Sequence, residues 1–222
     1  MTDNRLRQRR RAFTGYLYGL HRDLSSDNGA KAAESRRVLA RLRRTFSGPR
    51  QEAEAYEYVF KHDPPHSEEE AWLLLAGLFA LHPQPRRDPS RRGSLGGSMG
   101  ELEARRGFAA TRRFTDLVAR DRDGLPHHLR QTIRLLASHD ITVNYDQLLD
   151  DLVILLGDDH REQHAHSVRL RWAREFHRPS PEQVTRTTTG TTDTAGDASD
   201  GAPDGDPEED SAQDDYATTE NS

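Results

Sequence analysis

No polar side chain interrupts residues 71–81, and this run constrains the fold more than any other part of the sequence. A helix that is apolar on every side must be covered on every side, so it belongs at the centre of a bundle. The run is about half as long as the ~20 residues that a membrane-spanning helix needs. Ser67 followed by Glu70 predicts its start as a capping box, and His82-Pro83 predicts its end.

Apolar residues recur at helical spacing through most of residues 1–178, and no segment alternates with a period of two. Pro49 is expected to open one helix, and Thr111 and Asn144 are expected to cap two others. We therefore predict an all-α fold, a compact bundle of about eight or nine short helices. The expected helices lie within 13–24, 29–46, 49–60, 67–81, a segment ending near 105, 111–118, 125–136, 144–156 and 168–178.

The charge of the chain changes sharply after Arg178. Residues 1–178 hold 31 basic and 25 acidic residues, whereas residues 179–222 hold 12 acidic residues and one arginine. The second segment has too few apolar residues to offset its chain entropy. The sequence thus predicts a helical nucleic-acid-binding body, residues 1–178, and a disordered acidic tail, residues 179–222. The proline-containing segment 83–93 is a candidate boundary between two helical sub-bundles within the body.

Four rows of arginine lie on helical faces that are separate from the apolar faces. A basic body with such rows suggests a polyanion as partner, bound through its sugar-phosphate backbone because no base-reading motif is present. Arginine supplies 30 of the 32 basic residues, which suits bidentate phosphate contacts, but a GC-rich genome would produce the same bias. The first row has few acidic residues at i, i+4 spacing. The rows are Arg37/Arg41/Arg44, Arg113/Arg120, Arg130/Arg134 and Arg171/Arg174/Arg178.

No catalytic or metal-binding pattern stands out. The chain has no cysteine, so disulfides, thiol nucleophiles and Cys-based zinc sites are excluded. His160, His164 and His166 lack the glutamate that a zincin motif requires, and Asp158-Asp159 is typical of an acidic helix start. We predict a protein that is not an enzyme and has no metal site and no cofactor. The N-terminus lacks the apolar stretch of a signal peptide, so we expect a cytoplasmic protein with no membrane contact.

Residues 93–100 are rich in glycine and serine but lack the Lys-Ser/Thr of a nucleotide-binding loop. Two interpretations remain open. Backbone N–H groups at a helix start, beside Arg91 and Arg92, could hold one phosphate of a polymer, or the segment could be a plain flexible turn.

Several short motifs stand in an order that resembles the CasB family, the small subunit of the type I-E CRISPR Cascade surveillance complex. The resemblance covers roughly residues 10–178. The motifs are His82-Pro83, Gly93-Ser94-Leu95-Gly96, Arg112-Arg113-Phe114, Ala119-Arg120-Asp121-Arg122, Leu125-Pro126, Arg134-Leu135-Leu136 and Arg171-Trp172-Ala173-Arg174-Glu175-Phe176.

The resemblance implies an all-helical, non-enzymatic subunit that is present in two copies in the complex. There it would contact other Cascade subunits, help hold guide RNA paired with target DNA, and support the displaced DNA strand (the R-loop) in antiviral defence. Phosphate contacts suffice for such a role. Charge and motif position together give these candidate nucleic-acid-binding residues: Arg36, Arg37, Arg41, Arg44, Arg91, Arg92, Arg112, Arg113, Arg120, Arg122, Arg130, Arg134, Arg171 and Arg174.

Two other functions stay open at this point. One is a free-standing helical protein that binds RNA or single-stranded DNA outside CRISPR. The other is a metal-dependent nuclease that uses Asp158, Asp159 and the nearby histidines. The clusters Glu68-Glu69-Glu70 and Asp150-Asp151 also offer carboxylates to such an enzyme, although acidic clusters are typical of helix starts and exposed faces.

The acidic tail has two interpretations as well. It could compete with nucleic acid for the basic body, or it could be an inert solubilising extension.

Overall fold

The computed structural model describes residues 2–86, 93–157 and 161–178. Within those ranges it contains helices and loops and no strand, which confirms the predicted all-α fold. The predicted acidic tail, residues 179–222, lies outside the described residues, as do Arg91, Arg92, Asp158, Asp159 and His160.

Nine α-helices and two short 3-10 turns make up the described part of the chain. They are α1 (Thr2–Leu24), α2 (Gly29–Arg43), η1 (Arg44–Ser47), α3 (Pro49–Phe60), η2 (His66–Glu68), α4 (Glu69–Leu81), α5 (Leu95–Arg106), α6 (Phe108–Val118), α7 (Leu125–Ala137), α8 (Tyr145–Leu156) and α9 (Glu162–Phe176).

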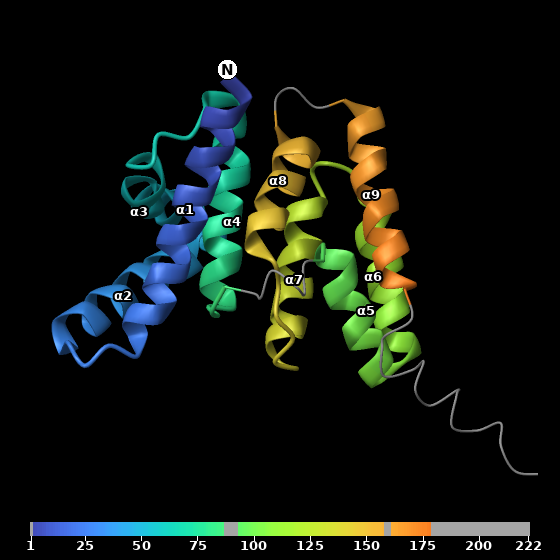
Figure 1. Cartoon of the computed structure of the whole chain (residues 1–222), viewed down its shortest axis with the longest axis horizontal. Helices are drawn as coiled ribbons and strands as arrows, with labels where there is room; N and C mark the ends of the chain where they lie inside the picture. Colours follow the sequence, from blue (N-terminus) through green and yellow to red (C-terminus); the bar gives the residue numbers. More distant parts are fainter. Residues whose placement is uncertain (1, 87–92, 158–160, 179–222) are drawn as a thin grey trace, which may run out of the picture.

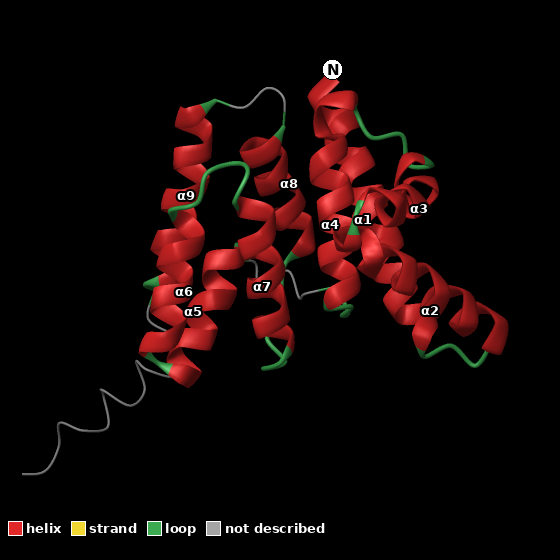
Figure 2. Cartoon of the chain, turned by 180° about the vertical axis from the view of Figure 1, so that it is seen from behind, coloured by secondary structure: helices red, strands yellow, loops and turns green. Residues whose placement is uncertain are grey.

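Helix α4 lies in the middle of the bundle, as the apolar run predicts. It packs against α2 and α3 from the first half of the chain and against α7 and α8 from the second half. Figures 1 and 2 show α4 and α8 side by side, with α1 to α3 beyond one and α5, α6 and α9 beyond the other. Trp72, Leu75 and Phe79 of α4 are fully buried, and they belong to one hydrophobic cluster that draws on both halves. The division into two sub-bundles near 83–93 stays a prediction.

Helix boundaries follow the local signals in some places and depart from them in others. Pro49 opens α3, and the Asn144 side chain accepts a hydrogen bond from the backbone N–H of Gln147 at the start of α8, as predicted. The capping predictions for Ser67 and Thr111 are wrong. Ser67 lies within η2, and Thr111 lies inside α6, which begins just after Gly107. Gly107 has a φ of +68°, a left-handed conformation that favours glycine and separates α5 from α6.

The glycine-rich segment is the first half of a helix that touches another helix backbone to backbone. Helix α5 begins at Leu95, earlier than predicted, and packs along α9. A Cβ atom on Gly96 would lie 2.0 Å from the carbonyl oxygen of Trp172, and one on Gly100 would lie 2.6 Å from that of Phe176. The glycines are therefore required by the close approach of α9.

Candidate nucleic-acid interface

Two carboxylates that the sequence offered as possible metal ligands are occupied by structural contacts. Asp150 accepts a hydrogen bond from Arg10 at 2.9 Å, and the same guanidinium donates to Glu68. Glu68 is buried and also accepts from the indole N–H of Trp72 at 3.0 Å. This cluster ties α1 to α4 and α8, so these carboxylates serve the fold.

A second cluster, which also joins a carboxylate to an arginine and a tryptophan, ties α8 to α9. Asp151 has no exposed surface, and its carboxylate accepts hydrogen bonds from Arg171, from the Trp172 indole and from Gln147. Burial raises the pKa of Asp151 to about 6, although the charge of Arg171 acts in the opposite direction. Arg171, predicted to bind nucleic acid, is therefore engaged in holding a buried carboxylate. Sequence spacing did not predict this contact, because Asp151 and Arg171 lie on different helices.

The row on α2 and η1 is also paired, which the sequence did not predict. Helix α3 packs against α2 and η1 and supplies the glutamates that pair with Arg41 and Arg44, whereas the partner of Arg37 is Glu34 of α2 itself. Ion pairs between exposed side chains are weak, so phosphates could replace the glutamates as partners of these arginines. The glutamates nevertheless lower the local positive charge. The contacts are Arg37 with Glu34 at 2.7 Å, Arg41 with the Tyr58 hydroxyl at 2.6 Å and Glu57 at 3.3 Å, and Arg44 with Glu54 at 3.5 Å.

Arg122 and Arg130 each reach from the second half of the chain to the first. Arg122 pairs with Glu70 of α4 at 3.0 Å. The Arg130 guanidinium lies over the ring of Phe46 of η1, 5.0 Å from its centroid, and its Nε atom is buried without a hydrogen-bond partner in the described part of the chain. Both arginines help to join the two halves, in addition to any contact with a ligand.

The remaining predicted arginines that the structure describes are exposed, and five of them form no ion pair or hydrogen bond with any described residue. These are the strongest nucleic-acid candidates, because a free guanidinium can bind phosphate without breaking an internal contact. Arg120 is also exposed, and among the described residues it donates only to the backbone carbonyl of Asp116. The five are Arg36 on α2, Arg112 and Arg113 on α6, Arg134 on α7 and Arg174 on α9.

Helices α6 and α9, which carry three of the five, are joined by stacked rings. Phe114 and Phe176 lie with ring centroids 4.2 Å apart and planes 3° apart. Sequence reasoning missed Arg106, which is exposed at the end of α5, and Arg169 on α9. The Arg105-Arg106 pair was the available signal for Arg106; Arg105 itself pairs with Glu101 at 2.6 Å.

The start of α5 already holds an anion, and this argues against the phosphate interpretation of the glycine-rich segment. The backbone N–H of Ser94 donates to the carboxylate of Glu175 on α9, and the Ser94 hydroxyl accepts from the N–H of Gly96. Ser94 and Gly96 are buried. A phosphate would have to displace the glutamate, so this interpretation is wrong for Ser94.

The described residues contain no group of three or more His, Asp or Glu side chains that could hold a metal ion. His164 and His166 are exposed on α9. None of the helices in the described ranges is long and apolar enough to cross a membrane.

No curated protein matches the sequence. Three solved structures share the fold. "Crystal structure of M. ruber CasB" is 27% identical, with 83% of this chain and 98% of that chain covered and a TM-score of 0.54. CasB from Thermobifida fusca is 25% identical, with coverages of 79% and 97% and a TM-score of 0.54. A chain of a "CRISPR RNA-guided surveillance complex" is 24% identical, with coverages of 82% and 99% and a TM-score of 0.60, a likeness of fold alone.

A family model described as "CRISPR-associated protein Cse2 (CRISPR_cse2)" matches residues 38–177. This range includes α4, the glycine-rich start of α5 and all of α6 to α9. The match confirms the resemblance that the ordered motifs predicted. The chain belongs to the CRISPR-associated Cse2 family.

Proposed function

We propose that the protein is the non-catalytic small subunit of a type I-E CRISPR Cascade surveillance complex. Membership of the Cse2 family supports this role, as does the shared fold with a chain of a CRISPR RNA-guided surveillance complex. In this role two copies contact other Cascade subunits, guide RNA, target DNA and the displaced DNA strand. The protein itself then contributes binding surface and no chemistry.

The single observation that carries the nucleic-acid role is the set of exposed arginines without internal partners in the described part of the chain. Arg112, Arg113, Arg134 and Arg174 lie on α6, α7 and α9, within the part of the chain that matches the family. Phosphates of an A-form duplex or a single strand can be bound through such side chains without base readout. Arg36, Arg91, Arg92 and Arg120 complete the set that we propose to bind directly.

The arginine-bound carboxylates of α8 support the absence of catalysis. Asp150 and Asp151 are neighbours on α8, and each accepts a hydrogen bond from an arginine, Asp150 through a half-exposed carboxylate and Asp151 through a buried one. A metal-dependent nuclease needs carboxylates that face substrate. Incubating labelled strands with Mg²⁺ or Mn²⁺ tests this point, and cleavage that Asp159→Ala abolishes would overturn it.

Co-expression with the other Cascade subunits and a guide RNA, followed by native mass spectrometry, tests the role as a whole. We expect two copies of this chain in each complex that contains guide RNA. An intact complex without this chain would reject the proposal and leave an independent helical protein that binds RNA or single-stranded DNA.

A further inference from the structure

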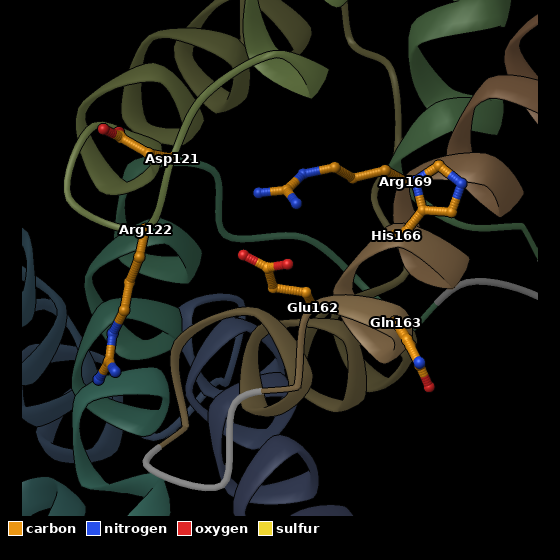
Figure 3. Close-up of a pocket in the computed structure, with 6 residues that line it drawn as sticks. All are labelled: Asp121, Arg122, Glu162, Gln163, His166 and Arg169. Atoms are coloured by element: carbon orange, nitrogen blue, oxygen red, sulfur yellow. The ribbon is translucent and has the colours of Figure 1, made fainter.

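A cleft of about 540 Å³ opens between the turn that joins α6 to α7 and the first turns of α9. Its size falls in the range of about 300–1,000 Å³ that is typical of small-molecule sites. Side chains from both elements line it, as Figure 3 shows. The lining residues are Asp121, Arg122, Glu162, Gln163, His166 and Arg169.

Arg169 is held in place and directed into the cleft. One of its terminal nitrogens donates to the backbone carbonyl of Arg120 at 2.8 Å. That bond fixes the guanidinium beside the α6–α7 turn, with its other N–H groups toward the open space (Figure 3). No carboxylate within the described ranges pairs with it, so the cleft presents an oriented donor fork with an unneutralised charge.

Glu162 faces Arg169 across the cleft without pairing with it. Its exposed carboxylate points toward the same open space in Figure 3, and it makes no ion pair or hydrogen bond with any described residue. Two opposite charges that face each other without pairing can each bind a different group of one ligand. Such a ligand carries an anion for Arg169 and a hydrogen-bond donor for Glu162.

The other charged groups of the cleft are engaged elsewhere. Arg122 extends away toward Glu70 on α4, and a carboxylate oxygen of Asp121 accepts the N–H of Gly124 at 2.9 Å. Gln163 also points outward in Figure 3. Of the Arg, Asp and Glu side chains that line the cleft, Arg169 and Glu162 are thus the two whose charged groups face its open space.

We infer that this cleft receives one nucleotide of a single-stranded DNA, with its phosphate on Arg169 and the amino group of its base on Glu162. Carboxylates accept hydrogen bonds from the amino group of cytosine, whereas the one base donor of thymine, its N3–H, lies between two carbonyl oxygens that repel a carboxylate. The cleft therefore favours amino-bearing bases over thymine. This inference rests on the proposed function, because it adds base selection to a surface that otherwise binds phosphates.

Fluorescence anisotropy with labelled oligo-dC and oligo-dT of equal length tests the inference on the full chain. We expect the wild type to bind oligo-dC roughly three- to tenfold more tightly, the net contribution of one typical hydrogen bond, because Glu162 is exposed to solvent. Glu162→Ala should abolish this difference, whereas Asp123→Ala, which removes an exposed charge of the same turn outside the lining, should preserve it. The ratio of the two affinities is compared between the wild type and each variant, because intrinsic differences in stacking between the two oligonucleotides cancel in that comparison.

Arg169→Ala should weaken binding of both oligonucleotides and lower the slope of log K against log salt by about 0.7, the contribution of one phosphate on a single strand. Arg161→Ala is the matched control, since Arg161 is exposed beside the start of α9 but does not line the cleft. It should leave the oligo-dC preference unchanged, whatever its effect on overall affinity.

Equal binding of the two oligonucleotides by the wild type, or a preference that survives Glu162→Ala, would overturn the inference and leave the proposed function standing. If neither oligonucleotide binds, the inference fails together with the nucleic-acid part of the proposed function. If Arg169→Ala prevents assembly with the other Cascade subunits but leaves DNA affinity unchanged, the cleft binds a protein segment and the inference is overturned.

Discussion

Replacing Gly96 with alanine should separate α5 from α9 and destabilise the protein. The added Cβ atom would lie 2.0 Å from the carbonyl oxygen of Trp172, 2.5 Å from its carbonyl carbon and 2.6 Å from its Cα. All three are backbone atoms, so no side-chain rotation can relieve the clash. Because non-bonded atoms pack at about 3.5–4.0 Å, the two backbones must move apart by roughly 1.5 Å.

This separation disturbs the best-packed part of the second half of the chain. Three fully buried side chains lie on these two helices, Met99 and Leu102 on α5 and Trp172 on α9. Each would lose contact with the opposite helix. Overpacking of a tight interior costs about 1–3 kcal/mol, and the clash with backbone places this variant at the upper end, near 3 kcal/mol. For a chain of this size, such a loss lowers Tm by roughly 6–12 °C.

Urea unfolding followed by circular dichroism measures the effect, with Gly15→Ala as the matched control. Gly15 lies in α1, and no neighbouring group comes within 4 Å of the position that an alanine methyl would take. Alanine there should therefore gain up to about 1 kcal/mol of helix propensity. Gly100→Ala should behave like Gly96→Ala, since its Cβ would lie 2.6 Å from the Phe176 carbonyl oxygen. A Gly96→Ala variant as stable as the wild type would refute the backbone contact between α5 and α9.

Three further outcomes follow from the arginines and the buried carboxylate. Exchanging Arg112 and Arg113 for alanine together should lower the salt slope of single-stranded DNA binding by about 1.4 and leave urea unfolding unchanged; an unaltered slope would remove both from the interface. Arg171→Ala should instead lower the free energy of unfolding by about 3–5 kcal/mol, because it leaves the Asp151 carboxylate buried without its arginine partner. Urea unfolding near pH 7 would detect this loss. The third outcome concerns pH. The pKa of Asp151 is raised to about 6 in the folded protein, so the folded state holds this proton more tightly and stability falls as pH rises from about 4 to 6. Relative to Asp151→Asn, the wild type should lose about 2 kcal/mol over that range, and parallel stability curves for the two proteins would contradict the raised pKa.

The sequence predicted those parts of the fold that depend on neighbours along the chain. Residues 71–81 form a buried helix because their own composition allows no other environment, and Pro49 and Asn144 act at helix starts through local geometry. Ser67 failed as a cap for a non-local reason. The carboxylate of Glu68 bonds to Arg10, 58 residues earlier, and Ser67 lies within the 3-10 turn that ends at Glu68.

The difference between local and long-range contacts also explains which interpretations of the candidate site were correct. Arg171 and Arg174 lie on one helix and carry the same charge, and nothing in their spacing shows that one of them pairs with a buried aspartate on α8. The glycines of 93–100 suggested a turn or a phosphate cradle, whereas Gly96 and Gly100 are required by the close approach of the α9 backbone. Which basic residues remain free to bind a ligand depends on partners that are distant in the sequence, and a single sequence does not reveal those partners.

The neighbouring aspartates of α8 bear on how the chain acquires its structure during synthesis. Asp150 binds Arg10, which leaves the ribosome 140 residues earlier, and Asp151 binds Arg171, 20 residues later. Helix α8 can therefore complete its polar contacts only after nearly the whole body has been translated. Until then Arg10 and Glu68 can already pair with each other, because both precede α8. We expect α1 and α4 to dock early, and α8 to join the N-terminal and C-terminal halves in a late, cooperative step.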